Sequence, residues 1–181
     1  MRDMDRQIVI VSGAPGAGKT TLAVPLAAGL GFPLVAKDYL KETVWDALGP
    51  PVGDLTWSRR TGGAAMELLW GIARRCPTVV LEANFRPHSH YERDQLVSLG
   101  GRIVEVHCRC PVDLAARRYA QRAAGPCHHA AHVGRTATAE WLTQFSRPVA
   151  VGPVVTVDTS TSPVDIQALV PRVRALLEAQ S

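Results

Sequence analysis

The sequence predicts an α/β domain with a parallel β-sheet, and three observations lead to this prediction. Short runs of β-branched and apolar residues alternate along the chain with segments of helical periodicity. The first run, residues 8–11, is apolar throughout, as expected for a strand covered on both faces. The chain has 181 residues, which suits a single domain.

Strands are expected where these runs stop at glycine, proline or polar residues, and helices where apolar residues recur at helical spacing. The expected strands are residues 8–11, 33–36, 78–81, 102–107 and 154–157. The expected helices are residues 19–30, 39–48, 59–75, 91–99, 112–123 and 164–179. Residues 125–136 are rich in glycine, histidine and alanine without a clear pattern, and we expect a mobile segment there.

A phosphate-binding motif lies between the first strand and the first helix. Gly13-Ala14-Pro15-Gly16-Ala17-Gly18-Lys19-Thr20 matches G-x-x-x-x-G-K-[ST] in the required strand-to-helix context, and Thr21 continues the ATP-binding segment. The glycines let backbone N–H groups point at a phosphate, and the helix N-terminus adds its positive end. Lys19 is expected to reach the β- and γ-phosphates and Thr20 to ligate Mg²⁺. The chain lacks an Asn-Lys-x-Asp guanine signature, which favours ATP.

Beyond this motif, the order of features resembles the small P-loop kinases, above all the chloramphenicol phosphotransferase, zeta-toxin and shikimate kinase group with its AAA-type ATP-binding domain. Asp38 follows the second strand, Glu82 ends the third, and an arginine-rich helix follows the fourth. The resemblance implies a single P-loop NTPase domain over residues 1–181, whose five-stranded parallel sheet has the order 2-3-1-4-5. It also implies an acceptor-covering segment at 39–75 and a lid region at 117–136.

Asp38 stands where the chloramphenicol phosphotransferase relatives place the carboxylate that contacts the acceptor hydroxyl. A carboxylate there can orient the acceptor oxygen towards the γ-phosphate and accept its proton. A capping role for Asp38, at the start of a helix beginning at Tyr39, is the alternative.

Glu82 stands where an acid would hold Mg²⁺ through water or contact the substrate. Asp158, at the end of the fifth strand, is a rival, although the resemblance places the loop at 158–160 beside the adenine. Asn84 and Arg86 follow Glu82 closely and are candidates for binding the substrate.

Arginines on the helix at 112–123 correspond to the lid arginines that neutralise the migrating phosphoryl group in the relatives. We expect Arg118 and Arg122, which are four residues apart on one helical face, to be catalytic. The alternative is a solvated helix face.

Two further clusters leave alternatives open. Cys127, His128, His129 and His132 could bind a metal, contact substrate or lie in an exposed lid, and a metal site is disfavoured because no partner ligands follow at a suitable spacing. Tyr39, Trp45, Trp57 and Trp70 could line an aromatic acceptor pocket, or pack in the core, as we expect of Trp70.

Composition limits the classes of ligand and partner that the chain is expected to bind. The net charge of +4 comes without a basic tract interleaved with aromatics, so phosphorylated ligands are favoured over nucleic acid. No apolar run is long enough to span a bilayer and no signal-peptide pattern is present, so we expect a cytoplasmic protein that is a monomer or homodimer.

The expected function is the ATP-dependent transfer of a γ-phosphate to a hydroxyl group of a small molecule. The favoured class of acceptor is an antibiotic or a nucleoside-like compound. A polynucleotide 5′-hydroxyl kinase, a nucleotide-sugar kinase and a non-catalytic ATP-binding switch are the alternatives.

Overall fold

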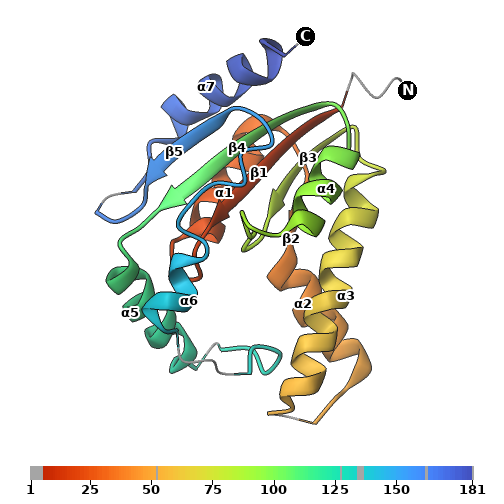
Figure 1. The fold of residues 1–181 in the computed structure, drawn as a ribbon, viewed down its shortest axis with the longest axis vertical. Helices are drawn as coiled ribbons and strands as arrows, with labels where there is room; N and C mark the ends of the chain where they lie inside the picture. The colour runs from red at the N-terminus through yellow and green to blue at the C-terminus, as the bar shows by residue number, and fades with distance from the viewer. Residues whose placement is uncertain (1–5, 52, 127, 134–136, 162, 181) are drawn as a thin grey trace.

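The computed structural model describes residues 6–51, 53–126, 128–133, 137–161 and 163–180. Five parallel strands form one sheet in the order β2-β3-β1-β4-β5, flanked by helices, which confirms the predicted fold class and strand order (Figure 1). The strands are β1 (Gln7–Gly13), β2 (Leu34–Ala36), β3 (Thr78–Glu82), β4 (Arg102–Arg109) and β5 (Val154–Asp158). The helices are α1 (Lys19–Leu30), α2 (Lys37–Leu48), α3 (Leu55–Ala73), α4 (His90–Ser98), α5 (Val112–Ala123), α6 (Ala139–Thr143) and α7 (Ile166–Glu178).

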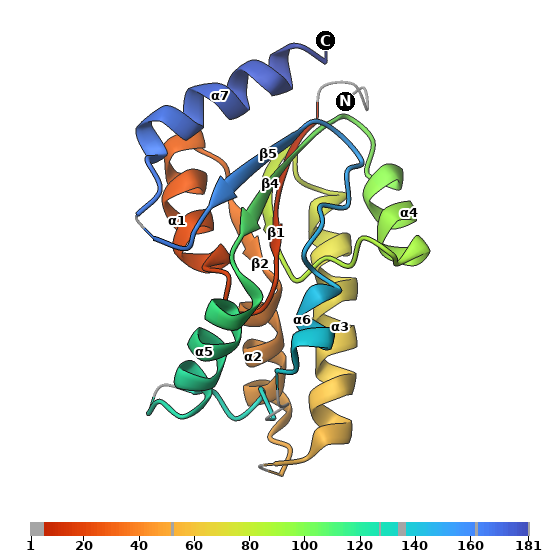
Figure 2. The same cartoon turned by 60° about the vertical axis from the view of Figure 1, so that its left-hand side comes forward.

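The central strand β1 is buried on both faces, as its continuous apolar run predicted. Val9 and Val11 point to one side, where α1, α5, α6 and α7 supply apolar residues. Ile8 and Ile10 point to the other side, where α3 and α4 supply them. This alternation follows from the two-residue period of a strand and fixes which helices cover each face. Figure 2 shows α1 and α7 on the opposite side of the sheet from α4.

Two helices begin earlier than predicted. α2 begins at Lys37 with Ala36 as the N-cap, so the alternative of Asp38 capping a helix at Tyr39 is wrong, because Asp38 already lies in the first turn. α3 begins at Leu55, where the Asp54 side chain accepts a hydrogen bond from Trp57 N. α2 leaves the carboxyl end of β2, at the edge of the sheet where parallel α/β folds bind their ligands, and α3 returns from the far end of α2 to the start of β3.

A buried polar group joins the strand before the P-loop to the linker that follows α6. Glu105 on β4 is fully buried and accepts hydrogen bonds from Ser12 Oγ and from the backbone N–H groups of Val149 and Ala150. His107 lies 2.9 Å from Ser12 Oγ through Nδ1. These bonds hold α6, which the sequence did not predict, beside the carboxyl end of β1.

In the described part of the chain, no helix is both long enough and apolar enough to cross a bilayer.

Candidate active site

The P-loop has the geometry that phosphate binding needs. Gly16 has a φ of 82°, and a Cβ on it would lie 2.2 Å from Ala115 O on α5, so only glycine fits there. Lys19 is buried and donates a hydrogen bond to Ala14 O over 3.0 Å, inside the loop. Burial lowers the pKa of Lys19, while Glu82 and Asp38 oppose that shift. The loop therefore holds the desolvated Lys19 ammonium group at a position where a bound phosphate could take the place of its contact with Ala14 O.

Thr20 and Glu82 come together beside Lys19. Thr20 Oγ1 donates to Glu82 Oε2 over 3.1 Å, and Glu82 is buried at the end of β3. Burial raises the pKa of Glu82, Lys19 opposes this, and Asp38 adds to it. Two oxygen donors at this separation suit a hard cation such as Mg²⁺. The rival acid, Asp158, is instead half-exposed and pairs with Arg109 over 3.3 Å. It lines neither of the two cavities beside the P-loop.

Asp38 faces the same place from the first turn of α2. Its carboxylate lies 3.1 Å from Lys37 Nζ. Burial raises the pKa of Asp38, but Lys37, His132 and Lys19 together outweigh burial and lower it. The carboxylate is therefore ionised at neutral pH and able to accept a hydrogen bond from a hydroxyl group.

A large cavity of ≈ 940 Å³, which we call the acceptor cavity, opens on this group of side chains. Its lining includes Thr20, Asp38, Glu82, Asn84, Arg86 and Arg122. The helices around it are α2 and α3 on one side and α5 and α6 on the other (Figure 1). The structure thus brings together most of the predicted catalytic, metal and substrate residues at one cavity.

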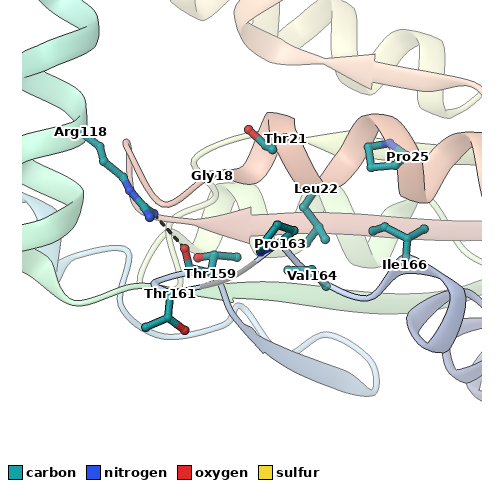
Figure 3. A pocket seen from close by; sticks show the side chains of 10 residues that line it. All are labelled: Gly18, Thr21, Leu22, Pro25, Arg118, Thr159, Thr161, Pro163, Val164 and Ile166. Atoms are coloured by element: carbon teal, nitrogen blue, oxygen red, sulfur yellow. Dashed lines mark hydrogen bonds between the residues drawn. The ribbon is translucent and has the colours of Figure 1, made fainter.

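A second pocket, of ≈ 590 Å³, lies on the other side of the P-loop (Figure 3). Gly18, Thr21 and Leu22 form one wall, and another is formed by Thr159, Thr161, Pro163, Val164 and Ile166. Arg118 lines this pocket and donates to Thr159 O over 2.9 Å and to Ser160 O over 3.0 Å. No described residue lines both this pocket and the acceptor cavity.

The two predicted arginines are therefore separated. Arg118 holds the loop after β5, whereas Arg122 lies over the Tyr119 ring at 5.8 Å and lines the acceptor cavity. Of the other predicted residues, Arg86 is paired with the buried Glu92 at 3.0 Å, which directs part of its charge away from a ligand.

Residues 128–133 cross the acceptor cavity and are bound to the helices on its far side. His132 Nε2 lies 2.7 Å from Glu42 Oε1, and His129 Nε2 lies 3.2 Å from Asp46 Oδ1. Ser58 Oγ on α3 accepts from the buried Lys41 and donates to Ala131 O over 2.6 Å. Burial, helped by Lys37, lowers the pKa of Lys41 to about 8. Cys127 lies outside the described residues, and among the described residues no three histidine, cysteine or acidic side chains come together in a group that could hold a metal ion.

The aromatic lining of the cavity differs from the one considered in the sequence. Trp70 packs on Phe85 in the core at 5.9 Å, as expected, and Trp45 is also buried. Trp57 is covered by the Arg60 guanidinium at 4.9 Å. Of the predicted aromatics only Tyr39 lines the cavity, and the others are Tyr119, Trp141 and Phe145. Trp141 and Phe145 could not be found from the sequence because α6 is too short to show a period.

Comparison with known proteins gives the family. A family model described as an AAA domain matches residues 8–148. The chain belongs to this family. A crystal structure of a Chloroflexus aurantiacus protein, provisionally described as a kinase, is 30% identical and has a TM-score of 0.82, with 96% of this chain and 99% of that chain covered. No curated protein matches the chain.

More distant structures share the fold alone. Shikimate kinase from Acinetobacter baumannii, in complex with shikimate, is 18% identical with a TM-score of 0.59, covering 97% of this chain and 95% of that chain. Chaetomium thermophilum Kti12, in complex with ADP-AlF3, is 16% identical with a TM-score of 0.63, covering 94% and 98%. The prediction of a small P-loop kinase fold is confirmed, and the subgroup within it stays a prediction.

Proposed function

We propose that the protein is an ATP- and Mg²⁺-dependent phosphotransferase that moves the γ-phosphate to a hydroxyl group of a small molecule. The observation that carries this proposal is the position of the ionised Asp38 carboxylate, in a cavity that it shares with Thr20 and Glu82 of the phosphate site. An acceptor hydroxyl bound there would meet the γ-phosphate end of the nucleotide. The kinase-like fold supports the same class of reaction.

The residues of the P-loop, together with Glu82, fit a nucleoside triphosphate and a divalent cation. Lys19 would bind phosphate oxygens in place of Ala14 O, and Thr20 and Glu82 would hold Mg²⁺, directly or through water. The bound cation would neutralise charge on the β- and γ-phosphates. We assign the second pocket to the nucleoside end, because it begins at Gly18 and Thr21 and Arg118 fixes its outer loop.

Asp38 would orient the acceptor and receive its proton. The acceptor oxygen forms a bond to the γ-phosphorus as the bond from that phosphorus to the β-phosphate oxygen breaks, which leaves ADP. Arg122 would stabilise charge on the transferred group from the acceptor cavity, whereas we reassign Arg118 to nucleotide binding. Asn84 and Arg86 line the same cavity and would contact the acceptor.

The acceptor is a small molecule of antibiotic or nucleoside-like size. The volume of the cavity, ≈ 940 Å³, suits a ligand of drug size, for which pockets of roughly 300–1,000 Å³ are usual. Residues 128–133 lie across it, which favours an enclosed molecule over a polymer strand.

The test is mass spectrometry of a pooled set of hydroxylated antibiotics, nucleosides, sugars and a 5′-hydroxyl oligonucleotide, incubated with the protein and Mg²⁺-ATP. We expect a product heavier by one phosphoryl group. Asp38→Asn should lower its rate by about 10²–10⁴-fold while ADP still binds. Asp94→Asn, an exposed acid on α4, is the matched control and should leave the rate unchanged.

Two outcomes would reject the proposal. ATP binding without transfer to any acceptor would favour a nucleotide switch, in which Lys19→Ala abolishes function and Asp38→Ala does not. Transfer to the oligonucleotide alone would favour a polynucleotide kinase.

A further inference from the structure

The acceptor cavity has two unlike walls that face each other across its width. One comes from α5 and α6 and the other from α3 (Figure 1). We propose that the cavity selects acceptors carrying a flat aromatic ring, held between an aromatic wall and the part of α3 where Gly62 and Gly63 have no side chains. This inference rests on the proposed function, because it takes the cavity to be the acceptor site.

The aromatic wall consists of Tyr119 on α5, Trp141 on α6 and Phe145 just after α6. The Tyr119 and Trp141 rings lie 5.9 Å apart at 68°, and the Trp141 and Phe145 rings lie 5.6 Å apart at 83°. Such edge-to-face contacts hold each ring by its neighbours. All three line the cavity, but Phe145 is only 5% exposed, so the half-buried Tyr119 and Trp141 supply most of a preformed apolar surface for a ring to pack on.

The wall is also fixed to the phosphate site. Arg122 lies over Tyr119 at 5.8 Å, and the linker after α6 is bound by the buried Glu105 through Val149 N and Ala150 N. A ring packed on this wall would therefore sit at a set distance from the place where the phosphoryl group arrives.

The opposite wall is the face of α3 that carries Gly62 and Gly63. Both line the cavity in the middle of a 19-residue helix, where glycine is an unfavourable choice. A Cβ on Gly62 would meet only Lys41 Cε, at 3.8 Å, and a Cβ on Gly63 would meet nothing within 4 Å. Packing within the protein does not require either glycine. The space they leave open belongs to the cavity, opposite the aromatic wall.

The polar groups fix how the ring-bearing molecule would lie. Asp38 and Lys37 stand at the start of α2, next to the phosphate site, and Arg59 lies one turn before Gly62 on α3. The hydroxyl of the acceptor would point to Asp38, its ring would occupy the space between the walls, and polar substituents would face Arg59.

The test is calorimetric titration of the full chain, with ADP and Mg²⁺ present, using ligand pairs that differ only in a ring. In two such pairs, uridine against ribose and phenyl β-glucoside against methyl β-glucoside, both members carry the same sugar and only one carries a flat ring, uracil or phenyl. We expect the member with the flat ring to bind at least about tenfold more tightly in at least one pair, which is roughly 1.4 kcal/mol. Equal affinities within both pairs, or no binding by any member, would overturn the inference.

Gly63→Leu and Gly71→Leu form the matched variant pair. Gly71 lies on the same helix but does not line the cavity, and a Cβ there would meet only Arg75 Nη1, at 4.0 Å. Both changes should keep the melting temperature or raise it by roughly 2–4 °C, because leucine favours a helix more than glycine does. Only Gly63→Leu should abolish the preference for the ring. An unchanged preference in Gly63→Leu would overturn the inference.

The same data separate the inference from the proposed function. If ring-dependent binding is found but no ligand is phosphorylated, the kinase proposal fails and the cavity still selects rings. If phosphoryl transfer occurs with equal efficiency on both members of a pair, the kinase proposal stands and the inference fails.

Discussion

His132 Nε2 lies 2.7 Å from Glu42 Oε1, and this contact ties residues 128–133 to α2. Asp38, Glu42 and Asp46 recur every fourth residue on that helix, so they form one acidic stripe. His129 meets Asp46 on the same stripe. Burial lowers the pKa of His132, and the opposing effects of Asp38 and Glu42 do not fully restore it.

The docking of residues 128–133 should depend on pH. The pKa of His132 is lower in the docked state than its ordinary value of 6.5, so docking is strongest above that value and weakens as the pH falls towards the lowered pKa. Asp38, Glu42 and Lys41 on α2, with His128 and His129 beside it, face this imidazole. Amide exchange in 128–133, corrected for intrinsic rates, should be faster at about pH 5.5 than at about pH 7.5.

His132→Gln should remove most of this pH dependence. The control is His90→Gln, at the exposed start of α4, which should keep it. Exchange that is equally protected at both pH values in the wild type would contradict the prediction.

Arg118 and Arg122 should have different kinetic effects. Arg118→Ala removes two hydrogen bonds to the loop after β5 and should raise the KM for ATP by about tenfold with little change in kcat. Arg122→Ala should lower kcat by about 10³-fold with little change in the KM for ATP, because it removes charge stabilisation in the transition state. Steady-state kinetics with the identified acceptor separate the two, and the same effect for both variants would argue against the assignment.

The protein should bind Mg²⁺ more weakly as the pH falls. Burial raises the pKa of Glu82, so this carboxyl becomes protonated at a higher pH than an ordinary glutamate and then binds the cation poorly. The Kd for Mg²⁺, measured by calorimetry with ADP present, should rise between about pH 7.5 and about pH 5.5. Glu82→Gln should show weak binding at both pH values. A wild-type Kd that stays constant would contradict the role of Glu82.

Glu105→Gln should destabilise the whole domain. The carboxylate accepts hydrogen bonds from Ser12, Val149 and Ala150 in the core, and an amide NH₂ would face those donors instead. We expect a loss of about 2–4 kcal/mol in the free energy of unfolding by urea. Glu140→Gln, on the exposed side of α6, should change it by less than about 0.5 kcal/mol. Equal stability in the two variants would show that the buried bonds contribute little.

The parts of the fold that the sequence predicted well are those with local signals. The continuous apolar run of β1 and the glycines around Lys19 carry their structural meaning within a few residues, and both lie where expected. Gly31 and Gly49 end their helices with left-handed backbone, directly after the ends at residues 30 and 48 that the sequence predicted. The strand order came from a resemblance, because no local pattern specifies which strands pair.

The parts that the sequence missed depend on tertiary contacts. α6 has five residues, and its place depends on the bonds that Glu105 makes to the linker after it. Arg118 and Arg122 look equivalent on a helical face, and only the packing of α5 between two cavities separates them. Asp38 is a candidate from its position after β2, but its ionised state depends on Lys37, His132 and Lys19.

The two cavities share no described lining residue, and this has a consequence for the order in which products leave. Residues 128–133 are bound to α2 and α3, so under the proposed function they would cover the phosphorylated acceptor and not the nucleoside end of ADP. We expect ADP to depart through its own opening while the acceptor product waits for residues 128–133 to detach. Product-inhibition patterns would then show ADP as the first product released, and the reverse order would mean that the two exits are coupled.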